Sequence, residues 1–426
     1  MLHGIREAAL FASTHRVIHD KQVDFLTCLN THFKHPIIRA LVKIHKLVLS
    51  VRLISSGTRW CTNPAAVLLG KLLRPMLDNE TSIAKSTEDV LNRVSCIEVT
   101  SETKTVSFDV EQLYPSLDQR KTRCAVSRVM HAYFEKHPQP YFGALIEFAL
   151  LLLDIVFAGQ LCSFLSCDQG VWKRSFWVQT QGITTGLSCA VEIANAYLLG
   201  LDAIAGSALA SSLKLYARYI DDVLMIFDHA HIEYIISALN LFDDGINVTY
   251  DYNDCLRATT YLDLFIEVRD NEFHHRLFRK PLCAYAYVPW SSSHPFATKC
   301  GIVRTELVRL LRTCKYASDF NREVCFFQGK LKDRGYPPKL VRHIVSQYPF
   351  DAKARILEKR CTNIKHVVPL KLEYCDGFDR LHVSAVLAKH KHLLPQDFSD
   401  HLRAVVCFKS APNLFRVRYK RFDESM

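Results

Sequence analysis

The chain has 426 residues, of which 49% are hydrophobic and 23% charged, and it carries a formal net charge of +11. This composition excludes a disordered chain, and the length suffices for two or three packed subdomains with an ample core. The basic balance fits a polyanionic partner but does not by itself identify one. The fifteen cysteines include no CxxC pair and no zinc-type spacing, which indicates free thiols in a reducing compartment.

The first acidic element in the chain is a short β-prone segment. The opening residues, MLHGIRE, lack the basic and then apolar layout of a signal peptide. Residues 105–110 (TVSFDV) then form a β-prone run that contains the single acid Asp109. The run is followed by residues 113–117 (LYPSL), so Tyr114 lies five positions after the acid. We therefore expect a strand that presents one carboxylate near its end.

Two elements are expected between this strand and the next acids. The apolar run 142–159 contains Glu147 and Asp154, which are seven residues apart and so share one helical face. This pattern favours a buried helix over a membrane span. Residues 179–186 (QTQGITTG) predict a glycine-flanked turn that leads into a helix over 190–198. Such a turn lets the backbone approach a flat ligand closely.

The second acidic element is the tetrapeptide YIDD at residues 219–222. The apolar runs 213–217 and 223–227 predict the arms of a β-hairpin with Asp221 and Asp222 at its turn. An acidic surface turn is the plain alternative for this tetrapeptide alone. Adjacent carboxylates on an apolar hairpin are unfavourable unless a cation offsets their charge. Together with Asp109, they would suit two Mg²⁺ ions, or Mn²⁺ instead, in nucleotidyl transfer.

The C-terminal third of the chain is the most basic part. Residues 271–350 hold 14 Lys and Arg against 5 Asp and Glu, an excess of nine positive charges. An amphipathic helix is predicted there, and a solvated, inert basic surface remains the alternative. A turn is expected at 333–338, and the chain after about residue 350 reads as a separate α+β segment. The apolar positions of the helix are Val303, Leu307, Leu310, Leu311 and Cys314.

The order of these motifs resembles that of the palm of reverse transcriptases. FDV and LYPSL come first, then QGITTG and AN, and then YIDD. Flanking motifs make the chain similar to the reverse transcriptases of Penelope-like retroelements, from about Leu41 to beyond Cys314. These flanking motifs are KIHK (43–46), RLISS (52–56), YLDL (261–264), FRKP (278–281), and SHP (293–295) followed by KCG (299–301).

The resemblance implies an α+β fold, a right-hand polymerase of fingers, palm and thumb with an antiparallel palm sheet. The implied thumb grips duplex phosphates. The expected domains are an N-terminal extension (1–40), fingers (41–106), a palm with inserted fingers helices (107–275), a thumb (276–350) and a C-terminal connector segment (351–426).

The resemblance also implies roles for the acids and their neighbours. Asp109, Asp221 and Asp222 are the expected catalytic metal ligands, with Val110 as a further metal position. In the family, the second acid of the YxDD pair is often more peripheral. Tyr114 is expected under the sugar of the incoming nucleotide, where its ring would exclude a ribose 2′-hydroxyl and so select dNTPs.

Further positions are implied for substrate binding. Gln181 and Gly182 would lie against the incoming nucleotide, and Tyr219 would pack beneath the primer terminus. Lys46 and Arg52 would hold the triphosphate, with Lys43 competing with Lys46 for the role. The general acid that protonates pyrophosphate stays open, because spacing cannot place Lys280.

The implied activity is RNA-directed DNA polymerisation from dNTPs on an RNA template and a DNA primer. No membrane partner is expected, and the expected location is intracellular and nuclear. Residues 186–191 lack the prolines common in the Penelope-like branch, and no GIY-YIG nuclease motif is present. The chain therefore resembles a nuclease-lacking or truncated member that depends on a separate nuclease. Two alternatives remain: an RNA-dependent RNA polymerase, and a catalytically decayed relic that binds nucleic acid.

Overall fold

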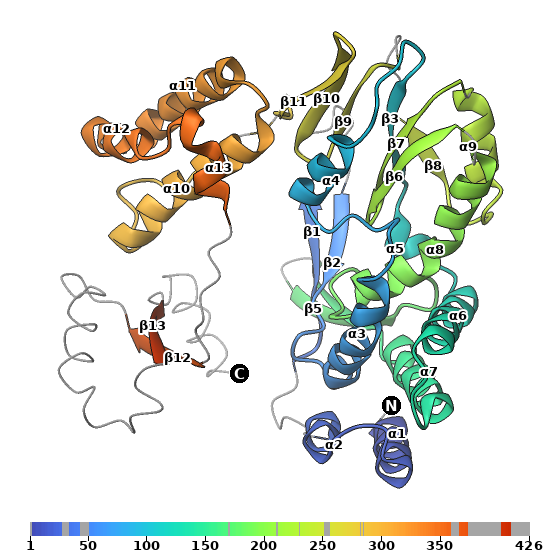
Figure 1. Cartoon of the computed structure of the whole chain (residues 1–426). Helices are drawn as coiled ribbons and strands as arrows, with labels where there is room; N and C mark the ends of the chain where they lie inside the picture. Colours follow the sequence, from blue (N-terminus) through green and yellow to red (C-terminus); the bar gives the residue numbers. More distant parts are fainter. Residues whose placement is uncertain are drawn as a thin grey trace. The chain divides into compact units, whose positions relative to one another are not determined.

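The structure is a computed structural model of the chain, drawn in Figure 1. It divides the chain into two compact units, Met1–Ala284 and Tyr285–Met426. The described residues are 2–27, 34–42, 51–168, 171–209, 212–229, 231–250, 256–281, 283, 285–358, 366–373 and 402–409.

A four-stranded sheet in the order β6-β7-β3-β8 lies at the centre of the first unit, and all of its strand pairs are antiparallel. Both acid-bearing elements predicted from the sequence lie in this sheet, and β6 extends two residues beyond its predicted end. The α+β class and the antiparallel sheet are therefore confirmed. The strands are β3 (Lys104–Val110), β6 (Leu213–Tyr219), β7 (Asp222–Phe227) and β8 (Val248–Tyr250).

Strand β7 is buried on both of its faces, which explains why its sequence is almost continuously apolar. Val223, Met225 and Phe227 belong to a core cluster shared with helices. Leu224 and Ile226 belong to a second cluster on the opposite face. The sheet is thus the middle one of three layers (Figure 1). Its acid-bearing end is held between two hydrophobic cores.

Helices form the layer on one face of the sheet. The helix predicted over 142–159 is confirmed as α7, with both of its acids exposed. Among the helices that the structure describes, none has the length and apolar character needed to cross a membrane. The N-terminal helices share this core, so the expected N-terminal extension is part of the unit. The helices are α1 (Leu2–His15), α2 (Asp20–Thr27), α3 (Asn63–Leu77), α6 (Gln119–Lys136), α7 (Phe142–Ala158), α8 (Ala190–Ala208) and α9 (Ile232–Asn240).

The opposite face of the central sheet packs on α4 (Thr87–Val94) and on a three-stranded antiparallel sheet in the order β11-β10-β9. The expected boundary between palm and thumb falls inside β11. The two units separate only after Ala284, because β11 is paired with β10 along its whole length. These strands are β9 (Ala258–Tyr261), β10 (Leu264–Arg269) and β11 (Glu272–Leu277).

Two antiparallel hairpins and one short helix complete the first unit. A parallel bridge between Ile37 and Ser163 links the two hairpins at their bases. The elements are β1 (Ile38–Val42) with β2 (Val51–Ser55), β4 (Leu161–Asp168) with β5 (Val171–Val178), and the helix α5 (Leu113–Ser116).

The second unit is helical, with one strand pair near its end. The predicted amphipathic helix is confirmed as α10, and its five predicted apolar positions are all buried. The predicted turn at 333–338 joins α11 to α12. The final pair, β12 with β13, is parallel. The elements are α10 (Phe296–Thr313), α11 (Ala317–Asp333), α12 (Pro338–Ser346), η1 (Phe350–Ala352), α13 (Lys353–Leu357), β12 (His366–Glu373) and β13 (Leu402–Lys409).

Candidate active site

Strand register brings the three predicted acids to one edge of the central sheet. Asp109 lies directly opposite Asp222 in the β3–β7 pair. The backbone N–H of Val110 donates to the carbonyl of Asp221 at 3.0 Å, which ties the hairpin turn to the end of β3. Tyr219 pairs with Asp222 across the hairpin, and its side chain is exposed at the same edge.

The electrostatics at this edge are those of crowded negative charge. Burial, together with the charges of Asp221 and Asp109, raises the pKa of Asp222 to about 6. Lys280 and Arg52 oppose this shift, so both cations lie within electrostatic range of the acid. Among the described residues, neither Asp221 nor Asp222 accepts a side-chain hydrogen bond or forms an ion pair. A cation from outside the chain would relieve the repulsion.

The donor chemistry of this edge fits magnesium. In the described part of the chain, no three His, Cys, Asp or Glu side chains converge closely enough to hold a metal ion by themselves. Magnesium does not need such a cage, because it keeps several waters and binds through one or two carboxylates together with substrate phosphates. Carboxylate oxygens at an open sheet edge are donors of this kind.

Tyr114 lies beside the acids because of the short helix α5. Gln112 caps this helix with φ of 48°, a left-handed conformation that turns the chain sharply after β3. Burial, together with the charge of Asp221, raises the pKa of Tyr114 to about 12, and Arg52 opposes this shift. The structure therefore brings Tyr114, Asp221 and Arg52 within electrostatic range of one another.

The predicted glycine turn packs directly against α5. Gly182 has φ of 67°, and a Cβ atom there would collide with the carbonyl oxygen of Pro115. The N–H of Ile183 donates to the carbonyl of Tyr114 at 2.7 Å. Only glycine fits this approach, so the turn and the tyrosine form a single wall. Gln181 is exposed on the turn, and its carbonyl accepts from Gln179.

Gln160, which the sequence did not single out, clamps this turn from inside. Its side chain is buried and donates to the carbonyl of Gly182 at 3.2 Å. It also accepts from the N–H of Thr184 at 2.6 Å. Since both the NH2 group and the oxygen of the Gln160 side-chain amide are used, the turn is held on two sides. A lone glutamine after an apolar run gives no signal of this role.

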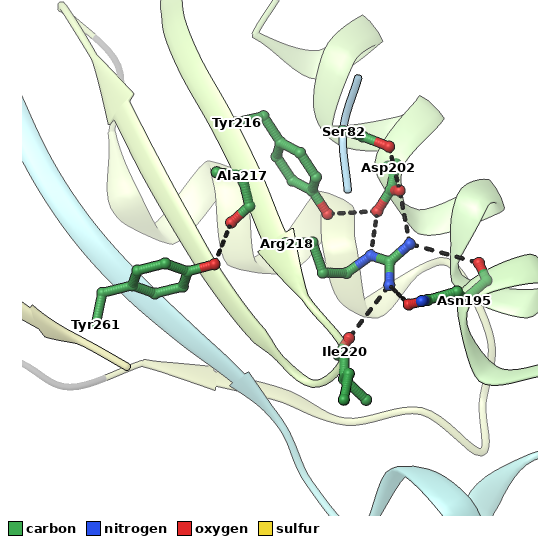
Figure 2. A network of polar contacts seen from close by, with 8 residues as sticks. All are labelled: Ser82, Asn195, Asp202, Tyr216, Ala217, Arg218, Ile220 and Tyr261. Atoms are coloured by element: carbon green, nitrogen blue, oxygen red, sulfur yellow. Dashed lines mark hydrogen bonds and ion pairs between the residues drawn. The ribbon is translucent and has the colours of Figure 1, made fainter. Parts of the chain in front are cut away.

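A second network that the sequence did not predict centres on Arg218, beneath the YIDD turn (Figure 2). Arg218 immediately precedes Tyr219 and is buried in contact with Asn195 and Asp202 of α8. The sequence shows only a basic residue beside an acidic motif. An arginine in such a position is far more often exposed than buried.

The predicted phosphate-binding cations are placed in part. Arg52 lies on β2, exposed and near the acids. Lys43 and Lys46 lie outside the described residues. Lys280, whose position spacing could not predict, is brought near Asp222 by the chain that follows β11. The N–H of Phe278 donates to the carbonyl of Asp263 at 2.8 Å and anchors that segment.

Comparisons with known sequences cover only part of the chain. A family model described as an animal helix-turn-helix domain matches residues 286–346, which include α10, α11 and α12. No curated protein matches the chain in sequence.

The solved structures to which the chain is similar include telomerases and viral RNA-dependent RNA polymerases. A truncated apo telomerase from Candida tropicalis is 12% identical with a TM-score of 0.39, covering 57% of this chain and 55% of that chain. Telomerase from Candida albicans, with a TWJ fragment of telomeric RNA, is 12% identical with a TM-score of 0.48, covering 72% and 56%. The BmCPV RNA-dependent RNA polymerase is 13% identical with a TM-score of 0.46, covering 77% and 28%.

The chain therefore spans little more than half the length of the telomerase chains that it matches. With TM-scores below 0.5, these likenesses carry no argument about activity. Function is therefore inferred from the geometry of the sheet edge that carries Asp109, Asp221 and Asp222.

Proposed function

We propose that this chain is a template-directed nucleic-acid polymerase, and specifically an RNA-directed DNA polymerase. The observation that carries the proposal is the register of β3 with β7, which sets Asp109 opposite Asp222 and links Val110 to Asp221. A carboxylate from one strand and two from a neighbouring hairpin are the donor set that two-metal nucleotidyl transfer uses. Asp109, Asp221 and Asp222 would hold the ions, with Val110 at the same edge.

When bound, two Mg²⁺ ions would lower the pKa of the primer 3′-hydroxyl and neutralise charge on the transferring phosphate. The groups of the chain then do the positioning. Arg52 would bind triphosphate oxygens, and the wall formed by Tyr114 and Gly182 would lie against the sugar and base. Lys280, which is within electrostatic range of Asp222, would serve as the general acid that protonates pyrophosphate.

The proposed partners are an RNA template, a DNA primer and dNTPs. The second unit supports duplex binding, because its residues 285–350 hold 11 Lys and Arg against 4 Asp and Glu, an excess of seven positive charges. The sequence motifs support membership of the Penelope-like branch, with a nuclear location and a separate nuclease supplying the primer end. Each of these finer assignments rests on the motifs alone.

An RNA-dependent RNA polymerase is the second candidate, since the same three carboxylates would serve the transfer of ribonucleotides equally well. Tyr114 argues against this candidate. A half-buried ring whose main chain is fixed by Ile183 leaves little freedom to accommodate a ribose 2′-hydroxyl. A decayed relic is the third candidate, and the three intact acids argue against it, because crowded carboxylates are costly to keep without a metal.

Primer extension tests the proposal directly. The purified chain is incubated with an RNA template, an annealed DNA primer, Mg²⁺ and either dNTPs or rNTPs. We expect extension with dNTPs that disappears in EDTA and in Asp109→Asn. Extension with rNTPs alone would favour the second candidate. Binding of primed template without extension, at any Mg²⁺ or Mn²⁺ concentration, would favour the third.

A further inference from the structure

The YIDD turn sits on a buried arginine whose every nitrogen is used. Arg218 is 0% exposed. Its Nε and Nη2 donate to the two carboxylate oxygens of Asp202 at 2.7 and 2.8 Å, a forked ion pair. Its Nη1 donates to the side-chain oxygen of Asn195 at 2.7 Å and to the carbonyl of Ile220 at 3.2 Å. Figure 2 shows these contacts converging on one guanidinium.

The carbonyl that Arg218 binds belongs to a strained residue. Ile220 has φ of 60°, a left-handed conformation that is rare for a β-branched side chain. Such a conformation is strained and persists only where the surroundings enforce it. Ile220 and Asp221 form the two-residue loop between β6 and β7. The guanidinium therefore supports the backbone unit that leads directly into Asp221.

The other partners of Arg218 lie on α8. Asn195 and Asp202 are seven residues apart and so lie on one face of that helix, two turns from each other. Helix α8 begins at Ala190, just after the glycine turn that packs on Tyr114. Asp202 is fixed in its turn by the hydroxyls of Ser82 at 2.7 Å and Tyr216 at 2.6 Å. Arg218 thus links helix α8, which follows the turn at residues 179–186, to the Ile220–Asp221 turn.

The backbone of Arg218 is held as firmly as its side chain. Its N–H donates to the carbonyl of Ser82, and its carbonyl accepts from Ala84, both at 2.8 Å. On the opposite face of β6, the hydroxyl of Tyr261 donates to the carbonyl of Ala217 at 3.1 Å. Because Arg218 is held through both its main chain and its side chain, its contact with Ile220 can fix the turn.

We propose that Arg218 is a positioning residue that holds the Ile220–Asp221 turn against helix α8 and thereby sets the Asp221 carboxylate for divalent metal. The metal-binding part of this inference rests on the proposed function. The positioning of the turn does not, because the turn, its strain and its support are all properties of the chain. Groups that orient ligands in this way typically change metal affinity or activity by about 10- to 100-fold when they are lost.

Arg218→Lys tests the proposal. Lysine keeps the positive charge, but it cannot form the bidentate ion pair with Asp202 and reaches fewer acceptors. The matched control is Lys214→Met, which breaks the ion pair between Lys214 and Asp228 at the other end of the same hairpin. Mn²⁺ binding is measured by calorimetry without substrate, and hydrogen exchange is measured on the backbone of residues 219–222. Melting temperatures and kinetic constants accompany both.

We expect Arg218→Lys to weaken Mn²⁺ binding by about tenfold or more, to lower kcat more than it raises the dNTP KM, and to speed exchange at 219–222. Lys214→Met should lower the melting temperature without any of these changes. Should Arg218→Lys fail to fold, Asn195→Ala keeps the fork to Asp202 and should show the same pattern at smaller amplitude. A loss of stability alone, with Mn²⁺ affinity within twofold of the wild type, would overturn the proposal. Absence of extension by a wild type that binds Mn²⁺ would overturn the polymerase assignment instead.

A second, independent observation concerns the β4–β5 hairpin. Two of the four tryptophans of the chain lie on β5, where Trp172 is 70% and Trp177 is 62% exposed. Side chains alternate along a strand, so Trp172 shares one face of β5 with Arg174 and with Phe176, which is 51% exposed, whereas Trp177 lies with Lys173 on the opposite face. Strand β5 contains no acid. A contiguous exposed patch of apolar rings beside polar residues marks an interaction surface.

The base of this hairpin is tied to the proposed nucleotide turn. The N–H of Gln179 donates to the carbonyl of Gln160 at 3.0 Å, and the same Gln160 clamps Gly182. Aromatic faces interleaved with cations are the surface that stacks bases and pairs with phosphates. We infer that the face of β5 that carries Trp172, Arg174 and Phe176 binds a single nucleic-acid strand, whose path leads to the turn at Gly182.

The test compares Trp172→Ala with Trp177→Ala, which removes an exposed ring from the opposite face of the same strand. Binding of a fluorescent oligo(U) and of anionic vesicles is measured, together with the sedimentation coefficient. Trp172→Ala should bind oligo(U) about tenfold more weakly because it loses a stacked base, whereas Trp177→Ala should bind it as the wild type does. Unchanged oligo(U) binding would overturn this inference, as would a variant that loses only vesicle binding or self-association.

Discussion

Two hairpin turns in the first unit contain residues with positive φ, but different interactions stabilise them. The β10–β11 hairpin closes through Asp270 and Asn271, and the β6–β7 hairpin closes through Ile220 and Asp221. At the first turn, both residues have positive φ, 51° and 58°, and their short polar side chains tolerate that conformation. At the second turn, an isoleucine has φ of 60°.

The difference lies in what supports each backbone. The Asp270–Asn271 turn is stable for local reasons and needs no buried partner, whereas the Ile220 turn depends on Arg218, Asn195 and Asp202. A turn that is determined locally can vary without affecting the rest of the unit. A turn that is determined by tertiary contacts is held in one position by its hydrogen bonds. A metal-binding carboxylate requires such precise positioning.

The largest expected difference between the two turns is in activity. Asp221→Asn should abolish primer extension, because it removes a metal-binding charge, with an unchanged or slightly raised melting temperature since like-charge repulsion is relieved. Asp270→Asn, the matched acid of the other turn, should extend primers as the wild type does. Extension assays and thermal melts measure both. An Asp221→Asn enzyme with a tenth or more of wild-type rate would remove Asp221 from the metal site.

Sugar choice tests how far the tertiary site extends beyond the acids. Tyr114→Ala should lower the dNTP-to-rNTP selectivity by roughly one to three orders of magnitude, because the ring no longer fills the space of a 2′-hydroxyl. Tyr114→Phe is the control, since it keeps the ring and loses only the hydroxyl. Competing dNTPs against rNTPs on one primed template gives the ratio. If the ratio does not change in Tyr114→Ala, the sugar gate lies elsewhere.

The pH dependence of stability should distinguish the acids of the two turns. In EDTA, the pKa of Asp222 is raised to about 6 by burial and by its two acidic neighbours, so its ionisation destabilises the fold as pH rises from about 4 through 6. Asp222→Asn should therefore melt about 2–6 °C above the wild type at pH 8, with partial exposure limiting the gain, and no higher at pH 4. Asp270→Asn, which changes the exposed acid of the other turn, is the control. A constant difference across pH would assign the effect to packing.

The smallest expected effect concerns the backbone of the locally determined turn. Asn271→Ile places a β-branched residue at φ of 58° without a buried arginine beneath it and should lower the free energy of unfolding by about 1–2 kcal/mol. Asn271→Gly should change it by less than about 0.5 kcal/mol. Urea denaturation measures both. Equal stability of the two variants would show that such a conformation needs no support, which would weaken the role given to Arg218.

Much of the site was predictable because its signals are local in sequence. The strand carrying Asp109 and the hairpin carrying Asp221 and Asp222 follow from β-prone, apolar runs, and residues 182–186 follow from their glycines. Three helices follow from 3.6-residue periodicity: α7, the amphipathic helix α10, and α8, which comes after the glycine turn. The expected domain boundary was displaced because a strand pairing, which periodicity does not reveal, keeps β11 in the first unit.

What the sequence determined by itself is therefore the set of reactive groups and the strands and helices that carry them. The tertiary structure decided how those groups meet: the register that sets Asp109 opposite Asp222, the approach of Lys280, and the burial of Arg218 between β6 and α8. The physical reason is that propensity and periodicity act over a few residues, whereas the register, burial and charge proximity named here join residues that are 16 to 113 positions apart. Arg218 reads as an ordinary surface cation in the sequence, and it becomes an anchor only because Asp202 and Asn195 are brought to it.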